Sequence, residues 1–154
     1  MSGNVADLIT SPLVRQVIGS AIDVHRALGP GLLESVYHTC MAHELGLRGV
    51  RYTSQAAVPV VYKGIALACG YRVDLIIEGT LLVELKTVDR ILPIHQAQML
   101  TYLKLLDLPQ ALLINFNATQ LREGLKSFLH TPGPSIVADD GSSPGDAPVS
   151  GRWS

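Results

Sequence analysis

Apolar residues in the first third of the chain recur every three or four positions, as on the buried face of an amphipathic helix. A first helix is predicted over residues 11–28, with Ser11 as its N-cap and Pro12 at its first helical position. Gly and Pro at residues 29–31 interrupt the pattern, and a second helix is expected over residues 33–46. The fold is therefore expected to begin with two helices that each bury one face.

The middle of the chain is rich in β-forming residues bounded by turn residues. Three strands are predicted in succession, over residues 56–64, 65–77 and 81–87, with Pro59 indicating an edge position. A helix, a buried strand and a final amphipathic helix follow, over residues 93–108, 110–116 and 119–130. The order ααβββαβα predicts an α/β fold with a mixed central β-sheet flanked by helices.

The composition fits one folded domain in a reducing, cytoplasmic compartment. The 154 residues are 47% hydrophobic, without an apolar run long enough to span a membrane and without the pattern of a signal peptide. Cys40 and Cys69 are the two cysteines, and their spacing does not indicate a metal site. We expect a short lead over residues 1–10, a domain over 11–130, and a disordered tail over 131–154, which is rich in Pro, Gly, Ser and Asp.

The charge of the predicted domain is nearly balanced. Residues 11–130 hold 11 Lys and Arg against 9 Asp and Glu, a balance of +2, and the whole chain has a formal net charge of −1. Proteins that bind nucleic acid mainly through its phosphates are strongly basic. The charge alone therefore neither supports nor excludes a nucleic-acid partner.

The strand pair VDLIIEGTLLVELK, residues 73–86, places charged side chains among apolar ones. A turn at residues 78–80 would set Asp74 directly opposite Glu84, with Cβ atoms about 5 Å apart. Like charges facing each other destabilise a sheet, so a cation is expected between them, and Mg²⁺ prefers such oxygen ligands. Lys86 lies two residues after Glu84 on the same strand face, where it could hold a water or stabilise charge on a phosphate.

A simpler interpretation is a surface hairpin that carries a Glu/Lys ladder on its solvent side. The neighbouring segments DLII and LLVEL are apolar on both faces, which is typical of central strands covered on both sides. This pattern favours a buried site over a surface ladder. The interpretation depends on the hairpin register, because a shift by one residue would turn every side chain to the other face.

These features together resemble a known family. An Asp followed ten residues later by Glu-x-Lys, after a helix that carries a Glu, resembles the PD-(D/E)XK nuclease superfamily. The segment GLLESVY, residues 31–37, is similar to the signature of the GxxExxY protein family. Further segments similar to that family follow in order along residues 11–130: PVVYKG, GYRVDLIIEG, VELKTV, HQAQMLTYLK and LLINFN. The resemblance implies a restriction-endonuclease-like fold, with a mixed four-stranded sheet flanked by helices.

The resemblance also implies roles for individual residues. It assigns the metal ligands to three carboxylates and one main-chain carbonyl, those of Asp74, Glu84, Glu34 and Leu85. Lys86 would orient or activate the attacking water, and Gln98 would position the substrate or Lys86. These five side chains, from Asp74, Glu84, Lys86, Glu34 and Gln98, are the predicted catalytic set.

Further residues are candidates for substrate contact. Arg72 precedes Asp74 by two positions on the same strand face, where it would contact a phosphate or only balance the acidic residues. His95 and Gln98 share a helical stripe with Met99, Tyr102 and Leu106, so Gln98 is expected as a polar amide within an apolar stripe. A purely structural role for His95 is an equal alternative. Tyr37 is expected in the core with its hydroxyl hydrogen-bonded. Three other histidines, His38, His43 and His130, have no zinc-site spacing with cysteine.

The leading hypothesis is a Mg²⁺-dependent nuclease, with Mn²⁺ able to substitute, that hydrolyses nucleic acid by a metal-bound water, with DNA expected before RNA. One alternative is a non-enzymatic accessory protein that keeps the fold and works in a larger complex, as the modest charge suggests. Another is a hydrolase of a small phosphorylated substrate. A homodimer also stays open, because this fold often pairs to cut two strands. No membrane partner is expected.

Overall fold

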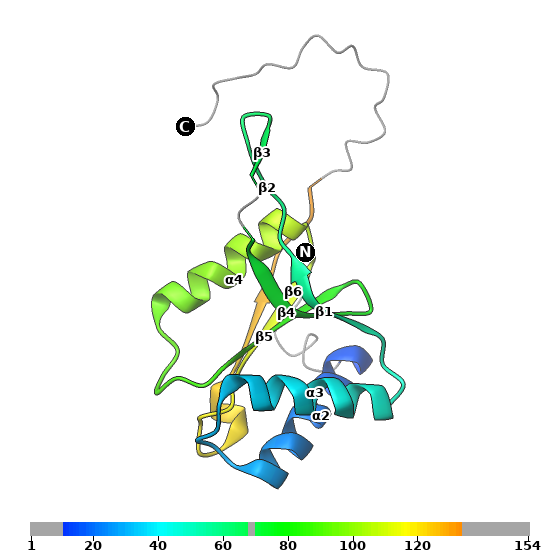
Figure 1. The fold of residues 1–154 in the computed structure, drawn as a ribbon, viewed down its shortest axis with the longest axis vertical. Coiled ribbons are helices and arrows are strands. Elements are labelled where there is room, and N and C mark those ends of the chain that lie inside the picture. The colour runs from blue at the N-terminus through cyan, green and yellow to red at the C-terminus, as the bar shows by residue number, and fades with distance from the viewer. Residues whose placement is uncertain (1–10, 68–69, 134–154) are drawn as a thin grey trace.

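The computed structural model describes residues 11–67 and 70–133, which form a five-stranded sheet with helices on both faces (Figure 1). The helices are α2 (Pro12–Leu28), α3 (Glu34–Leu47), α4 (Pro93–Leu106) and the short 3-10 helix η1 (Leu121–Gly124). The strands are β1 (Tyr52–Ala57), β2 (Val60–Tyr62), β3 (Ile65–Leu67), β4 (Arg72–Ile77), β5 (Leu81–Lys86), β6 (Gln110–Asn115) and β7 (Leu125–Leu129). The predicted mixed α/β fold is confirmed.

The main sheet has the strand order β1-β4-β5-β6-β7, five strands where the resemblance implied four. Strands β5 and β6 run parallel, and the other neighbouring strands run antiparallel. Strands β2 and β3 pair only with each other and form a hairpin that projects from the body of the molecule (Figure 1). Strand β5 is thus the central strand of the sheet.

Two hydrophobic clusters cover the two faces of the sheet. On one face, apolar residues of α2 and α3 pack against Leu81, Val83 and Leu85 of β5. On the other face, Leu82 packs in a cluster that includes Met99 of α4. Alternation along β5 therefore buries both of its faces, which explains the nearly continuous apolar run in the sequence.

The predicted strands over residues 56–64 and 65–77 each divide into two. The first is interrupted at Pro59, which has no amide hydrogen to donate to a neighbouring strand, so β1 ends at Ala57. Strand β1 also begins earlier than predicted, at Tyr52. The Val58 amide instead donates to the Tyr71 carbonyl at 2.9 Å. Between β3 and β4, residues 68–69 are outside the described part of the chain. The sequence pattern predicted that both segments form strands, but it did not predict the break within each of them.

The predicted final helix over residues 119–130 is wrong, and the order ααβββαβα is wrong at its last element. The segment forms η1 and then β7, which pairs antiparallel with β6. At Gly124 an added Cβ would meet the Asn115 carbonyl oxygen, so the backbone passes closely under the end of β6. Pairing satisfies backbone groups of β6 that would otherwise lie at a free sheet edge. This long-range pairing overrides the local amphipathic pattern.

The predicted ends of the chain fall largely outside the structure. The lead over residues 1–10, and the predicted tail from residue 134 onward, lie outside the described residues. Within residues 11–67 and 70–133, none of the helices combines the length and apolar character that a membrane span requires.

Replacing Gly124 with alanine should destabilise the fold, because the new Cβ would collide with the Asn115 carbonyl oxygen. We expect a loss of about 1–3 kcal/mol in the free energy of unfolding, as for other overpacked sites. The measurement is urea denaturation followed by circular dichroism. The matched control is Gly46→Ala in α3, where no atom lies within 4 Å of the new Cβ. Equal stability of the two variants would contradict the close approach.

Candidate active site

The candidate site is built on the hairpin of β4 and β5. The two strands pair in the predicted register, with Leu75 opposite Val83, and the next residues toward the open end are Asp74 and Glu84. Oδ2 of Asp74 accepts a hydrogen bond from the Leu85 amide at 2.8 Å, which holds its carboxyl group against β5. The structure therefore brings the two carboxyl groups together, as the turn length indicated.

The turn that sets this register has a left-handed backbone. Glu78 has a φ of 50° and Gly79 a φ of 70°, and the Thr80 amide donates to the Ile77 carbonyl at 3.0 Å. Such turns match the twist of the paired strands. Glu78 is also held by Arg51, whose Nη2 lies 2.9 Å from Oε1 of the glutamate. The turn thus fixes which residues of β4 and β5 face each other.

Glu84 is a buried acid, with 9% of its surface exposed. Burial raises its pKa to about 9, and the Asp74 charge and a hydrogen bond with the Asp74 side chain act in the same direction. The charge of Lys86 acts against this shift. At neutral pH the metal-free protein therefore keeps a proton on Glu84, and a cation at this place would take over the role of that proton.

The backbone of β4 is irregular at Asp74. Val73 packs in the cluster on the α4 side of the sheet, whereas Leu75 and Ile77 pack against α2 and α3. Residues two apart in a regular strand share a face, so the facing of β4 changes at Asp74. On β1, Gln55 lies in register with this position and has a left-handed φ of 53°. Such non-glycine residues are uncommon and often occur at functional sites.

Helix α3 adds two residues to the site. Glu34 is its first residue, and its pKa is raised by burial and then by the charge of Asp74, while Lys86 and His38 lower it. His38 lies one turn later, and its Nε2 is 3.2 Å from the main-chain oxygen of Asp74. His38 was not among the predicted site residues, because it was considered only as a zinc ligand and its spacing did not fit a zinc site. Its i+4 spacing from Glu34 was the signal that places both on one helix face.

The turn before α3 is fixed by Tyr37. Its hydroxyl donates to the Gly29 carbonyl and accepts a hydrogen bond from the Leu32 amide at 3.2 Å. Its ring stacks on Phe116 at 4.5 Å between centroids. The expectation of a core tyrosine with a hydrogen-bonded hydroxyl is confirmed. Gly31 has a φ of 100°, a conformation that disfavours other residues, so this turn sets where α3 and Glu34 begin.

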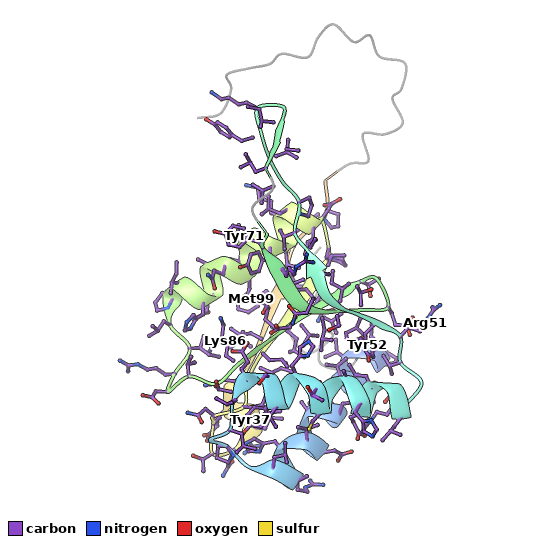
Figure 2. The ribbon with its side chains drawn as sticks, in the orientation of Figure 1. Tyr37, Arg51, Tyr52, Tyr71, Lys86 and Met99 are labelled. Atoms are coloured by element: carbon purple, nitrogen blue, oxygen red, sulfur yellow. The ribbon has the colours of Figure 1, made fainter. Side chains whose placement is uncertain are left out.

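Lys86 ends β5 and is half-buried between α3 and α4 (Figure 2). Its main-chain oxygen accepts a hydrogen bond from the Phe116 amide at 2.8 Å. Beyond it, the buried Asn115 side chain bonds both the amide and the carbonyl of Val88, at 3.0 and 2.8 Å. Within the described part of the chain, the ammonium group of Lys86 has no hydrogen bond or ion pair. It is therefore available to a substrate or a water.

Two further predicted residues, Gln98 and Tyr102, lie on α4 and differ in how far they are buried. Gln98 is exposed, where the sequence placed it within an apolar stripe, and it lines a groove together with Tyr102. Burial raises the pKa of Tyr102, and the charges of Glu84, Tyr71 and Asp74 add to the rise. Tyr102 is therefore close to both carboxyl groups.

His95 and Arg72 make hydrogen bonds to the backbone instead. Nδ1 of His95 accepts from the Leu92 amide at 3.0 Å, which caps α4. Arg72 is exposed, and its Nη1 donates to the Gln55 carbonyl at 3.1 Å. The structural alternative for His95 thus has direct support. Arg72 is exposed two residues before Asp74 on β4, and its side chain contacts β1.

The predicted metal ligands are only partly assembled. Asp74 and Glu84 are in contact, and Glu34 is near enough for Asp74 to raise its pKa. Among residues 11–67 and 70–133, however, no group of three or more His, Cys, Asp or Glu side chains is arranged to hold a metal ion. The donor set still fits Mg²⁺, which usually takes only one or two carboxylates and fills its other positions with waters.

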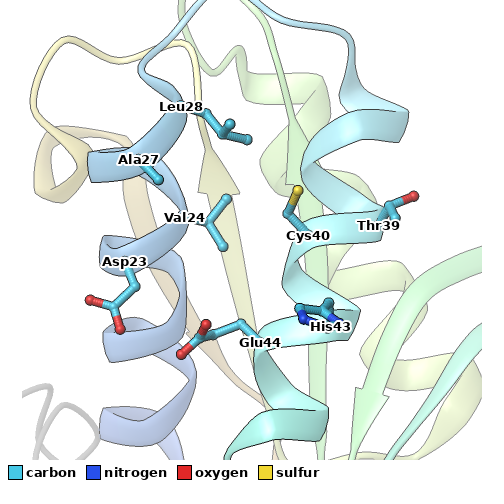
Figure 3. Close-up of a pocket in the computed structure, with 8 residues that line it drawn as sticks. All are labelled: Asp23, Val24, Ala27, Leu28, Thr39, Cys40, His43 and Glu44. Atoms are coloured by element: carbon cyan, nitrogen blue, oxygen red, sulfur yellow. The ribbon is translucent and has the colours of Figure 1, made fainter.

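A second hollow, of about 360 Å³, lies between α2 and α3 (Figure 3). Cys40 and His43 line it from α3, and Val24 lines it from α2. Its acidic residues, Asp23 and Glu44, are already paired with Arg48, at 2.8 and 3.0 Å. The acidic groups of this hollow are therefore less available to a ligand than the Asp74 and Glu84 carboxyls.

The mixed sheet flanked by helices, with a carboxyl pair and a lysine on two neighbouring central strands, is consistent with a restriction-endonuclease-like fold. The model of the PD-(D/E)XK nuclease superfamily matches residues 11–128, and the chain belongs to that superfamily. Searches of curated proteins and of solved structures gave no match.

Replacing Glu84 with glutamine should stabilise the metal-free protein at alkaline pH. The folded-state pKa of about 9 lies above the ordinary 4.5, so the unfolded chain loses this proton first. Wild-type stability should therefore fall as pH rises through this window, and the variant lacks that loss. We expect the variant to melt several degrees higher than wild type at pH 8 in EDTA, and much closer to it at pH 5. Glu123→Gln, at an exposed position, is the control; the same pH dependence in both variants would contradict the assignment to Glu84.

Proposed function

We propose that this chain is a Mg²⁺-dependent nuclease that hydrolyses phosphodiester bonds of nucleic acid, with DNA as the first candidate. The observation that carries the proposal is the carboxyl pair of the buried Glu84 and the half-buried Asp74, with the half-buried Lys86 close enough for its charge to act on Glu84. A carboxyl pair with one buried member is costly for stability, so its presence at the centre of the sheet favours a functional role. Membership of the nuclease superfamily supports the same reaction class.

Each residue then has a defined task. Asp74 and Glu84 would hold the cation, with Glu34 and the Leu85 carbonyl as further candidates, and Mn²⁺ would substitute for Mg²⁺. The cation supplies a Lewis acid that neutralises charge developing on the phosphate. Lys86 would orient the attacking water and stabilise negative charge in the transition state.

Surrounding residues would support this centre. The hydrogen bond from the Leu85 amide keeps Asp74 in place before any cation arrives. His38 contacts the Asp74 main-chain oxygen, and its charge counteracts the rise in pKa that burial causes at Glu34. Arg72 is suited to a phosphate beside the reacting one, since its guanidinium is exposed on the strand that carries Asp74. Gln98 and His95 remain candidates for substrate contact from α4.

Mg²⁺ should raise the melting temperature of the wild-type protein but not of Asp74→Asn or Glu84→Gln, because these carboxyls form the proposed binding site. Binding should also release about one proton at pH 7, since Glu84 must ionise to bind a cation. Calorimetry in two buffers with different ionisation enthalpies measures that proton. Binding with no proton release, or equal stabilisation of the variants, would contradict this metal site.

Lys86→Ala should lower the rate of cleavage by about 10²–10³-fold, as expected for loss of one group that stabilises transition-state charge. Its stabilisation by Mg²⁺ should be retained, because Lys86 is not a proposed ligand. The assay follows plasmid and single-stranded DNA with Mg²⁺ or Mn²⁺. Lys104→Ala, which removes an exposed cation from α4, is the matched control and should cleave at the wild-type rate. Equal cleavage by all three proteins would remove Lys86 from the mechanism.

The nearly balanced charge favours a second candidate function, in which the protein acts within a larger complex that supplies the grip on the nucleic acid. In that case the isolated chain would bind Mg²⁺ without cleaving DNA. Activity that appears only in a co-purified complex, and that Lys86→Ala abolishes, would distinguish this candidate from a self-sufficient nuclease.

A further inference from the structure

A groove of about 320 Å³ lies beside the proposed active site, on the α4 side of the sheet. Its walls include residues from the approach to the β2–β3 hairpin and from α4: Val58, Val60, Tyr71, Ala97, Gln98 and Tyr102. Tyr102 connects the groove with the site, because the charges of Glu84 and Asp74 act on its hydroxyl. The groove therefore leads away from the carboxyl pair toward the base of the hairpin.

The chemistry of the walls is aromatic and apolar. Tyr71 is 56% exposed at the hairpin base (Figure 2), and the half-buried Tyr102 lies in the same groove. None of the residues that line the groove carries a formal charge. Gln98 and Thr101 offer exposed hydrogen-bonding groups along α4. The groove thus suits a flat, largely apolar group with polar edges, and a phosphate would have no cation within it.

Cationic side chains lie outside the groove, where the sugar-phosphate backbone of a bound strand would pass. Lys86 stands at the end of β5, and Arg72 follows Tyr71 directly on β4. Binding of single strands typically combines cations that meet the phosphates with aromatic side chains on which bases stack. Double-stranded nucleic acid keeps its bases paired and stacked, so it offers no free base face to Tyr71. Gripping a duplex would also call for more cations than this surface provides.

Building on the proposed function, we propose that this groove binds an unpaired nucleobase next to the scissile phosphate, with Tyr71 as the stacking platform. The substrate class is accordingly single-stranded nucleic acid, or the unpaired end of a duplex. Gln98 and the hydroxyl of Tyr102 face the polar edge of the base. Because stacking accepts every base, the groove gives little sequence preference.

The test measures binding in EDTA, where no cleavage takes place. The probes are a fluorescein-labelled oligo-dT and a blunt duplex of the same length, followed by fluorescence anisotropy. Wild type should bind oligo-dT more tightly than the duplex. Tyr71→Leu should weaken oligo-dT binding about tenfold, while Tyr71→Phe, which keeps the ring, should stay within about twofold of wild type. Melting curves check that each variant is folded.

Tyr62→Ala provides the matched control, because Tyr62 is 54% exposed on the hairpin but does not line the groove. It should bind oligo-dT like wild type. A loss equal to that of Tyr71→Leu would move the binding site to the hairpin and overturn the proposal. Unchanged binding by Tyr71→Leu, or a preference for the duplex, would overturn it as well. So would a change of oligomeric state in Tyr71→Leu by size-exclusion chromatography, which would show that a second copy covers the groove.

The outcome separates this inference from the proposed function. Tyr71-dependent binding of oligo-dT by a wild-type protein that cleaves nothing would support the groove and contradict the nuclease. Cleavage of the duplex by wild type and Tyr71→Leu at equal rates would support the nuclease and contradict the groove.

Discussion

The carboxyl groups of Asp74 and Glu84 face each other at the centre of a sheet that is covered on both sides. The surrounding residues offset the repulsion between them and the cost of their burial. Burial and mutual repulsion would strongly oppose two charges here, so Glu84 holds a proton and Asp74 accepts the Leu85 amide. Lys86 and Glu34 approach from the end of β5 and the start of α3. The charges of these four side chains act on one another, so one bound cation would change the protonation of Glu84 and the interactions of the others together.

Much of this centre could be predicted because it depends on local geometry. The turn at residues 78–80 and the alternation along two short strands were enough to set Asp74 against Glu84. The unbroken apolar run of β5 indicated cover on both faces, which the two clusters confirm. The glycines at 29 and 31 marked the break before α3, where both have left-handed φ values.

The errors arose where contacts distant in sequence decide the structure. The segment Leu125–Leu129 has an amphipathic pattern that fits a helix, but the open side of β6 takes it as a strand. Gln98 seemed to belong to a buried stripe, because periodicity does not show where the sheet ends beneath a helix; it is exposed. The i+4 spacing of His38 from Glu34 indicated a shared helix face, but the contact of His38 with the Asp74 carbonyl forms only once α3 lies on the sheet.

The loop after β6 adds hydrogen bonds to the packing that holds the first two helices on the sheet. His25 bonds the Ala118 carbonyl at 2.9 Å and Gly31 bonds the Asn117 side chain at 3.1 Å, across separations of 93 and 86 residues. Contacts so distant in sequence form late, because a long chain segment must close first. During synthesis, α2 and α3 therefore leave the ribosome long before their partners exist. Until then the apolar faces of this helix pair stay uncovered, and such transiently exposed apolar surface is prone to aggregation.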